Sequence, residues 1–247
     1  MGHQTTGYLP GMYAKKRPGR TKMVDQCIRE WEAKRAMEKR EKAARAPADL
    51  NNCITFSRKI GVGALEVADL VAQKTGFRVV DREIIEHIAQ SKELHARTVD
   101  YFDERYPGYI NEFAALIIGE KSFTSGDYMR DLANTVVSIA ESGPTIFVGR
   151  AAHLILPRDK VLAVRFISSN EHCVRRVADI MNITESDAAR ELEEESRRQR
   201  EFFRKSFHKK DASPYEFDLV INRDFFPQAE WAAKIVDRAY RLKFDEK

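Results

Sequence analysis

Cysteine is scarce in this sequence, and long apolar runs are missing. Only three cysteines occur among 247 residues, at positions 27, 53 and 173, and no two of them form a CxxC pair. This spacing excludes a disulfide framework and provides no zinc ligand set. The chain also lacks an apolar stretch of the roughly 18 residues that cross a bilayer, and its first residues lack the apolar segment of a signal peptide. We therefore expect a soluble, cytoplasmic protein without membrane contacts.

Positive charge is unevenly distributed. Residues 1–50 hold twelve Lys and Arg against six acidic residues and carry +6, whereas the whole chain carries +4, which leaves −2 for residues 51–247. Residues 1–20 are rich in Gly, Pro and basic residues, a composition typical of disorder. Val24, Ile28 and Trp31 then follow helical spacing. We predict a basic arm over residues 1–50, disordered and then helical, followed by one folded domain over 51–247.

Beyond residue 51, short apolar runs alternate with helical segments. This alternation predicts an α/β domain with a parallel sheet and helices on both faces. A long segment without a strand pattern separates the second and third runs and predicts a helical insert over about 92–142. The predicted strands are Cys53–Phe56, Phe77–Val80, Thr145–Val148, Val161–Ile167 and Phe217–Ile221, and the predicted insert helices are Glu93–Tyr101, Tyr109–Ile118 and Asp127–Ser142.

The first strand runs into the sequence Gly61-Val62-Gly63 and then directly into a helix. Glycines at such a turn let main-chain N–H groups close on an anion, next to the positive end of the helix dipole. The lysine of a complete phosphate loop is missing, because Ala64, Leu65 and Glu66 stand where the lysine and a hydroxyl residue are expected. From this pattern alone, an anion site and an ordinary strand-to-helix turn are equally good interpretations.

Three further features follow strands or lie on one helix. Asp81-Arg82 comes directly after the second strand, where α/β sheets bind ligands. Taken alone, Asp81 is better interpreted as the cap of the next helix, a role that is compatible with ligand binding. Gly149-Arg150 follows the third strand, where the cation would bind a phosphate or form a structural ion pair. A charged helix is predicted to begin near Thr184 and to run to about Ser206. Its arginines are suited to phosphoryl transfer or to a solvated surface; they are Arg197, Arg198, Arg200 and Arg204.

In this order and spacing, the motifs resemble those of the cytidylate kinase-like family, a nucleoside monophosphate kinase branch of the P-loop NTPases. The resemblance covers residues 52 to about 243. It rests on segments 54–58, 61–63, 81–85, 146–150, 200–203 and 218–222. It implies a three-layer fold with a five-stranded parallel sheet, a helical insert that binds the monophosphate and an arginine-rich lid over about 184–212. It also implies ATP as phosphoryl donor, Mg²⁺, and a pyrimidine monophosphate such as CMP or dCMP as acceptor.

The resemblance assigns roles by position. Donor phosphates would lie at the glycine turn and the residues around it, which are Arg58, Lys59, Gly61, Val62, Gly63 and Ala64. The acceptor would contact Asp81, Arg82 and Arg150. The catalytic lid arginines would be Arg197, Arg198, Arg200 and Arg204. The resemblance names no metal ligand.

The departures from the family pattern keep other functions open. Loss of a cation at the phosphates removes about 3–4 kcal/mol of transition-state stabilisation, which Arg58 or Lys59 would recover in part by reaching into the turn. Ala151 also stands where related kinases have Asp or Gly. One alternative is a nucleotide-binding regulatory protein with little or no catalysis. Another is binding of nucleic acid or an acidic partner through the arm over residues 1–50.

Overall fold

The computed structural model describes residues 29, 50–82, 85, 123–207 and 212–245. Most of the predicted arm over residues 1–50 lies outside the described residues, as do the predicted helices Glu93–Tyr101 and Tyr109–Ile118. Across the part of the chain that is described, no helix combines the length and apolar character needed to span a membrane.

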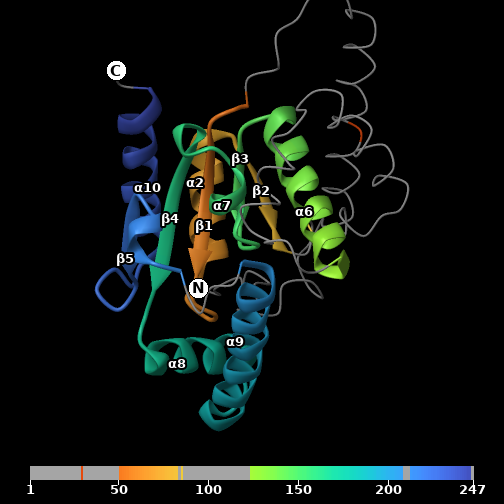
Figure 1. Cartoon of the computed structure of the whole chain (residues 1–247). Coiled ribbons are helices and arrows are strands. Elements are labelled where there is room, and N and C mark those ends of the chain that lie inside the picture. The colour runs from red at the N-terminus through yellow and green to blue at the C-terminus, as the bar shows by residue number, and fades with distance from the viewer. Residues whose placement is uncertain (1–28, 30–49, 83–84, 86–122, 208–211, 246–247) are drawn as a thin grey trace, which may run out of the picture.

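Five parallel strands form one sheet in the order β2-β3-β1-β4-β5 (Figure 1). The strands are β1 (Cys53–Arg58), β2 (Arg78–Asp81), β3 (Thr145–Val148), β4 (Val161–Ile167) and β5 (Leu219–Asn222). All five predicted strands are present. β1 is longer than predicted because Ser57 and Arg58 continue the pairing with β4. Since every strand is parallel, all carboxyl ends meet at the same edge of the sheet.

Helices cover both faces of the sheet and enclose two apolar cores. On one face Ile54 and Phe56 of β1 pack with α2 (Ala64–Thr75) and α10 (Ala229–Phe244). On the other face Cys53 packs with α6 (Phe123–Ser142) and α7 (Ala152–Ile155). Side chains alternate along β1, so adjacent residues such as Cys53 and Ile54 pack into cores on opposite faces of the sheet. The predicted fold class, a parallel five-stranded α/β sheet with helices around it, is confirmed. Two short 3₁₀ helices, η1 (Arg158–Lys160) and η2 (Pro214–Glu216), complete the described elements.

Two further helices, α8 (Asn170–Met181) and α9 (Glu185–Phe207), lie at the carboxyl edge of the sheet (Figure 1). Thr184 caps α9, because its Oγ1 accepts a hydrogen bond of 3.1 Å from the Asp187 N–H. Leu192 of α9 belongs to the core on one face, and Phe207 at its other end belongs to the core on the opposite face. α9 therefore crosses the edge at which the predicted site residues lie.

Candidate functional site

The glycine turn joins β1 to α2 with two residues in the left-handed region. Gly61 has φ 81° and Gly63 has φ 77°. Gly63 is the N-cap of α2, and it contributes no side chain to the first N–H groups of the helix. Ile60 and Val62 are buried and anchor the turn in the core. The main chain therefore has the shape that the sequence predicted, with the amino end of α2 directly behind the turn.

Side chains of α8 and α9 cover this turn closely. A Cβ atom on Gly61 would lie 2.9 Å from Leu192 Cδ2 and 3.1 Å from Cys173 Cβ. A Cβ atom on Gly63 would lie 2.9 Å from three atoms of the Arg176 guanidinium. Glycine is therefore required here for close approach of other side chains as well as for the backbone conformation. Ala64, where a phosphate loop has lysine, is 2% exposed and belongs to the core.

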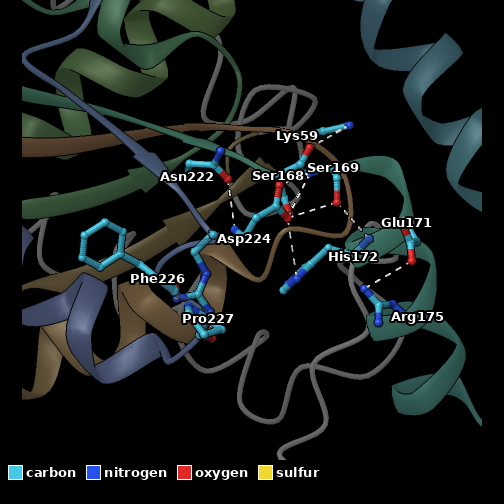
Figure 2. Close-up of polar contacts among 11 residues, drawn as sticks. Lys59, Ser168, Ser169, Glu171, His172, Arg175, Asn222, Asp224, Phe226 and Pro227 are labelled. Carbon is cyan, nitrogen blue, oxygen red and sulfur yellow. Dashed lines mark hydrogen bonds and ion pairs between the residues drawn. The ribbon is translucent and has the colours of Figure 1, made fainter.

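Arg58 and Lys59 lie on different sides of the β1 terminus. Lys59 Nζ donates a 2.9 Å hydrogen bond to the Ser168 carbonyl, beyond the end of β4 (Figure 2). Arg58 is 7% exposed, and its charge interacts with those of Asp81, Arg82 and Arg150. The side chain of Arg58 therefore faces the predicted acceptor residues rather than the glycine turn.

Three arginines gather at the carboxyl ends of β1, β2 and β3. Burial lowers the pKa of the Arg58 guanidinium to about 9, and the charges of Arg82 and Arg150 lower it further against the opposing effect of Asp81. Burial also lowers the pKa of Arg150 to about 9, with Arg82 acting in the same direction and Glu195 opposing it. We call Arg58, Arg82, Arg150, Asp81 and Glu195 the arginine cluster. Among these five described residues, three cations face two carboxylates, a balance that suits the group to an anion.

The backbone after β3 is unusual at the point where it presents Arg150. Gly149, Arg150 and Ala151 have φ angles of 96°, 47° and 52°, three successive left-handed residues. For a residue other than glycine this conformation costs roughly 1–2 kcal/mol. The Gly149 N–H donates to the Phe56 carbonyl at 2.9 Å and holds the tip of β3 beside β1. Strain of this kind is concentrated at functional sites.

The inward face of α9 closes over the arginine cluster. Glu195 Oε2 lies 3.6 Å from Arg82 Nη1, and Gln199 Nε2 donates to the Arg58 carbonyl at 3.1 Å. The Phe202 ring lies against Arg150, whose Cζ is 4.1 Å from the ring centroid. Glu195, Gln199 and Phe202 follow Leu192 at intervals of three or four residues, so all four lie on one face of α9. This spacing is the signal in the sequence from which the three residues could have been predicted.

The predicted lid arginines lie on the outer surface of α9. Arg197, Arg198, Arg200 and Arg204 are all exposed. Arg198 pairs with Glu195 at 2.7 Å and also with Glu194, and Arg200 pairs with Glu193 at 2.7 Å. Of these four arginines, Arg198 reaches the arginine cluster through its ion pair with Glu195, from the solvent side of α9. The structure does bring together Asp81, Arg82 and Arg150, and it adds Arg58, which the resemblance assigns to the donor side.

A second polar network ties the ends of β4 and β5 to the turn (Figure 2). Asp224 accepts hydrogen bonds from the Ser168 hydroxyl at 2.6 Å and the Ser169 N–H at 2.8 Å. The Ser168 hydrogen bond is the main cause that lowers the pKa of Asp224. The fully buried Arg223 donates to three carbonyls at 2.7–2.9 Å, those of Phe226, Pro227 and Gln228. These bonds fix the two loops that flank the glycine turn.

The arginine cluster and the network around Asp224 both contain carboxylates, but these carboxylates do not form a metal site. Among the residues that the structure describes, no group of three or more His, Cys, Asp or Glu side chains could hold a metal ion. Glu66, in the first turn of α2, is bonded to Arg176, and Asp224 is bonded to serines. A magnesium ion that binds mostly through nucleotide phosphates and water needs only one or two such carboxylates.

Known proteins similar to this chain include one family and several solved structures. The model of the cytidylate kinase-like family matches residues 53–224. A crystal structure of an uncharacterized protein from Eubacterium ventriosum is similar, with a TM-score of 0.57 and 17% identity over 75% of this chain and 98% of that chain. A shikimate kinase from Bacteroides thetaiotaomicron aligns with a TM-score of 0.37 and 13% identity over 78% of this chain and 98% of that chain. No curated protein sequence shows significant similarity.

The structural similarity at a TM-score of 0.57 supports a shared fold and no more. The family match is more informative because it extends from β1 to the residues just after β5. It therefore includes the glycine turn, the arginine cluster and both helices at the carboxyl edge. This chain belongs to the cytidylate kinase-like family, and its function is of the nucleotide kinase-like type.

Proposed function

We propose that the protein transfers the γ-phosphoryl group of ATP to a nucleoside monophosphate, with CMP and dCMP as the first acceptors to test. The observation that carries this proposal is the arginine cluster, which lies beside the glycine turn at the same edge of the sheet. A kinase of this type needs two anion sites at neighbouring positions, one for the donor and one for the acceptor phosphate.

The acceptor phosphate would occupy the arginine cluster. Arg58 is buried and Arg150 is partly buried, and the lowered pKa values of both reflect a cost of holding charge away from water. A bound phosphate would offset that cost, because it would supply negative charge among these cations. Asp81, which is fully buried at the end of β2, would accept a hydrogen bond from a hydroxyl or amino group of the acceptor.

The donor phosphates would lie at the glycine turn, where the first N–H groups of α2 have no partner within the helix. ATP would bring Mg²⁺ with it, and the ion would neutralise charge on the transferring group. Transfer itself needs positioning and charge stabilisation rather than a covalent intermediate. α9 would exclude water from the acceptor side, since Gln199 and Phe202 already contact Arg58 and Arg150.

The direct test is production of ADP in a coupled assay with CMP, dCMP and UMP as acceptors. We expect acceptor-dependent turnover by the wild-type protein. Arg150→Ala should lower kcat/KM for the acceptor by about 100-fold or more, because a charge-stabilising contact is lost. Arg241→Ala is the matched control, since Arg241 is an exposed arginine that pairs only with Asp237 among the ion pairs described. Absence of acceptor-dependent ADP at high enzyme concentration would refute the proposal.

A second candidate function is nucleotide binding without useful turnover. It is favoured by the turn itself, where Ala64 is buried in the position of the missing lysine and Leu192 and Cys173 cover Gly61. Calorimetry with ATP and CMP distinguishes the two functions. Binding of nucleotide without ADP formation would support the regulatory function, and absence of any nucleotide binding would refute both. Nucleic-acid binding through residues 1–50 stays a prediction from the sequence, since the arm lies outside the described residues.

A further inference from the structure

We propose that Arg176 of α8 supplies the cation for the donor phosphates that the glycine turn itself lacks, and that Glu66 holds its guanidinium in place. The inference rests on the proposed function, in which the turn binds the donor. It assigns to a helix outside the turn the role that a lysine at position 64 would have.

The Arg176 guanidinium lies flat against Gly63. Its Cζ, Nε and Nη2 atoms would all be 2.9 Å from a Cβ on that glycine, which means that the Cβ position points at the face of the group. Any side chain at position 63 would displace it. Gly63 therefore provides the space for a cation directly beside the amino end of α2, where an anion is favoured by the helix dipole.

Glu66 fixes the orientation of this cation. Its Oε2 lies 2.6 Å from Arg176 Nη2, and the two side chains are 34% and 14% exposed. This ion pair uses only the Nη2 side of the guanidinium. Arg176 Nη1 is buried, and no acceptor among the described residues reaches it within hydrogen-bond distance. Arginine can therefore keep its bond to Glu66 and still donate to a phosphate oxygen.

Neighbouring cations are directed elsewhere. Lys59 donates to the Ser168 carbonyl, and Arg58 belongs to the arginine cluster. Arg223 donates to three carbonyls of its own loop. Arg175, next to Arg176 in sequence, is 59% exposed and lies 3.6 Å from Glu171 one helical turn away. Of these residues, Arg176 is the one whose guanidinium lies on the turn.

Binding of ATP and of CMP, measured by calorimetry on the full chain, tests the assignment. Arg176→Ala should weaken ATP binding by about 10- to 100-fold, the range expected for a lost charge-assisted contact. CMP affinity should not change, because the arginine cluster is separate from Arg176. Arg175→Ala is the matched control and should change neither affinity. Arg176→Lys keeps the charge but loses the planar contact, so its ATP affinity should lie between those of wild type and Arg176→Ala.

Equal ATP affinity of wild type and Arg176→Ala would overturn the inference, and so would an equal loss for ATP and CMP. A different result would refute the proposed function alone. If ATP binding depends on Arg176 but no acceptor-dependent turnover occurs, the kinase activity is refuted and the role of Arg176 stands. No ATP binding by the wild type would overturn both. If Arg176→Ala does not fold, Gly63→Ala serves instead, because its Cβ displaces the guanidinium. Gly76→Ala then controls for the backbone cost, since Gly76 has φ 72° and open space around it.

Discussion

Replacement of Gly61 by alanine tests whether α8 and α9 rest on the glycine turn in solution. At φ 81° alanine costs roughly 1–2 kcal/mol relative to glycine. The added Cβ would also lie 2.9 Å from Leu192 Cδ2 and 3.1 Å from Cys173 Cβ. Overpacking of this kind costs about 1–3 kcal/mol. Gly61→Ala should therefore lower the free energy of unfolding by about 2–5 kcal/mol.

Gly76→Ala provides the control that separates the two costs. Gly76 has a similar φ of 72°, but nothing lies within 4 Å of its Cβ position. Gly76→Ala should therefore lower the free energy of unfolding only by the backbone cost, roughly 1–2 kcal/mol. Urea denaturation followed by far-UV circular dichroism measures both variants. A double-mutant cycle of Gly61→Ala with Leu192→Ala should show a coupling of at least about 0.5 kcal/mol, because removal of the leucine relieves the contact.

Equal losses for Gly61→Ala and Gly76→Ala, with no coupling to Leu192, would refute this reasoning. Such a result would mean that α8 and α9 stand away from the turn in solution. It would also remove the geometric basis for a cation delivered to the turn by α8, because Cys173 and Arg176 belong to the same helix.

Three other measurements follow from the structure. Inorganic phosphate should raise the melting temperature of the wild type, and Arg150→Ala should abolish most of that rise; an unchanged response would place the anion elsewhere. Burial lowers the pKa of His172 below 6.5 and the charges of Arg223, Arg176 and Arg175 act in the same direction against Asp224, so the folded state binds fewer protons than the unfolded state near pH 6. The free energy of unfolding should therefore decrease as the pH falls below 6.5, and His172→Asn should lose that part of the decrease. Thr184→Ala removes the N-cap of α9 and should lower the free energy of unfolding by about 1 kcal/mol in urea, whereas no change would show that the cap contributes nothing.

The strands could be predicted because each is a short apolar run bounded by glycine, proline or charge. Thr145–Val148 and Val161–Ile167 have the predicted bounds. The last strand begins at Leu219, two residues later than predicted. Phe217 instead packs on the His153 ring at 4.7 Å and donates its N–H to the Pro214 carbonyl. Local propensity does not show such contacts, because they depend on residues far away in the sequence.

Three of the five residues of the arginine cluster could be predicted, because each of them directly follows a strand. Asp81, Arg82 and Arg150 directly follow strands, and parallel strands bring their carboxyl ends together. Arg176 and Gln199 lie within helices, where the rotation of the helix decides which face meets the sheet. The rotation of α9 depends on packing of Leu192 and Phe207 in the two cores, and that of α8 depends on packing of Cys173 and Val177 in one of them. The resemblance assigns Arg197 and its neighbours to a lid, and in the structure they lie on the exposed face of α9, where charged residues usually occur.

Moving the cation from the turn to α8 changes what donor binding requires. A lysine within a phosphate loop is in place whenever the loop is folded. Arg176 is in place only when α8 lies against the turn, and that position also brings Cys173 against Gly61. Leu192 of α9 makes the same approach, and Gln199 of the same helix contacts the end of β1. Under this arrangement, donor binding, placement of the missing charge and closure over the acceptor site would be one coupled event, since all three depend on the same two helices.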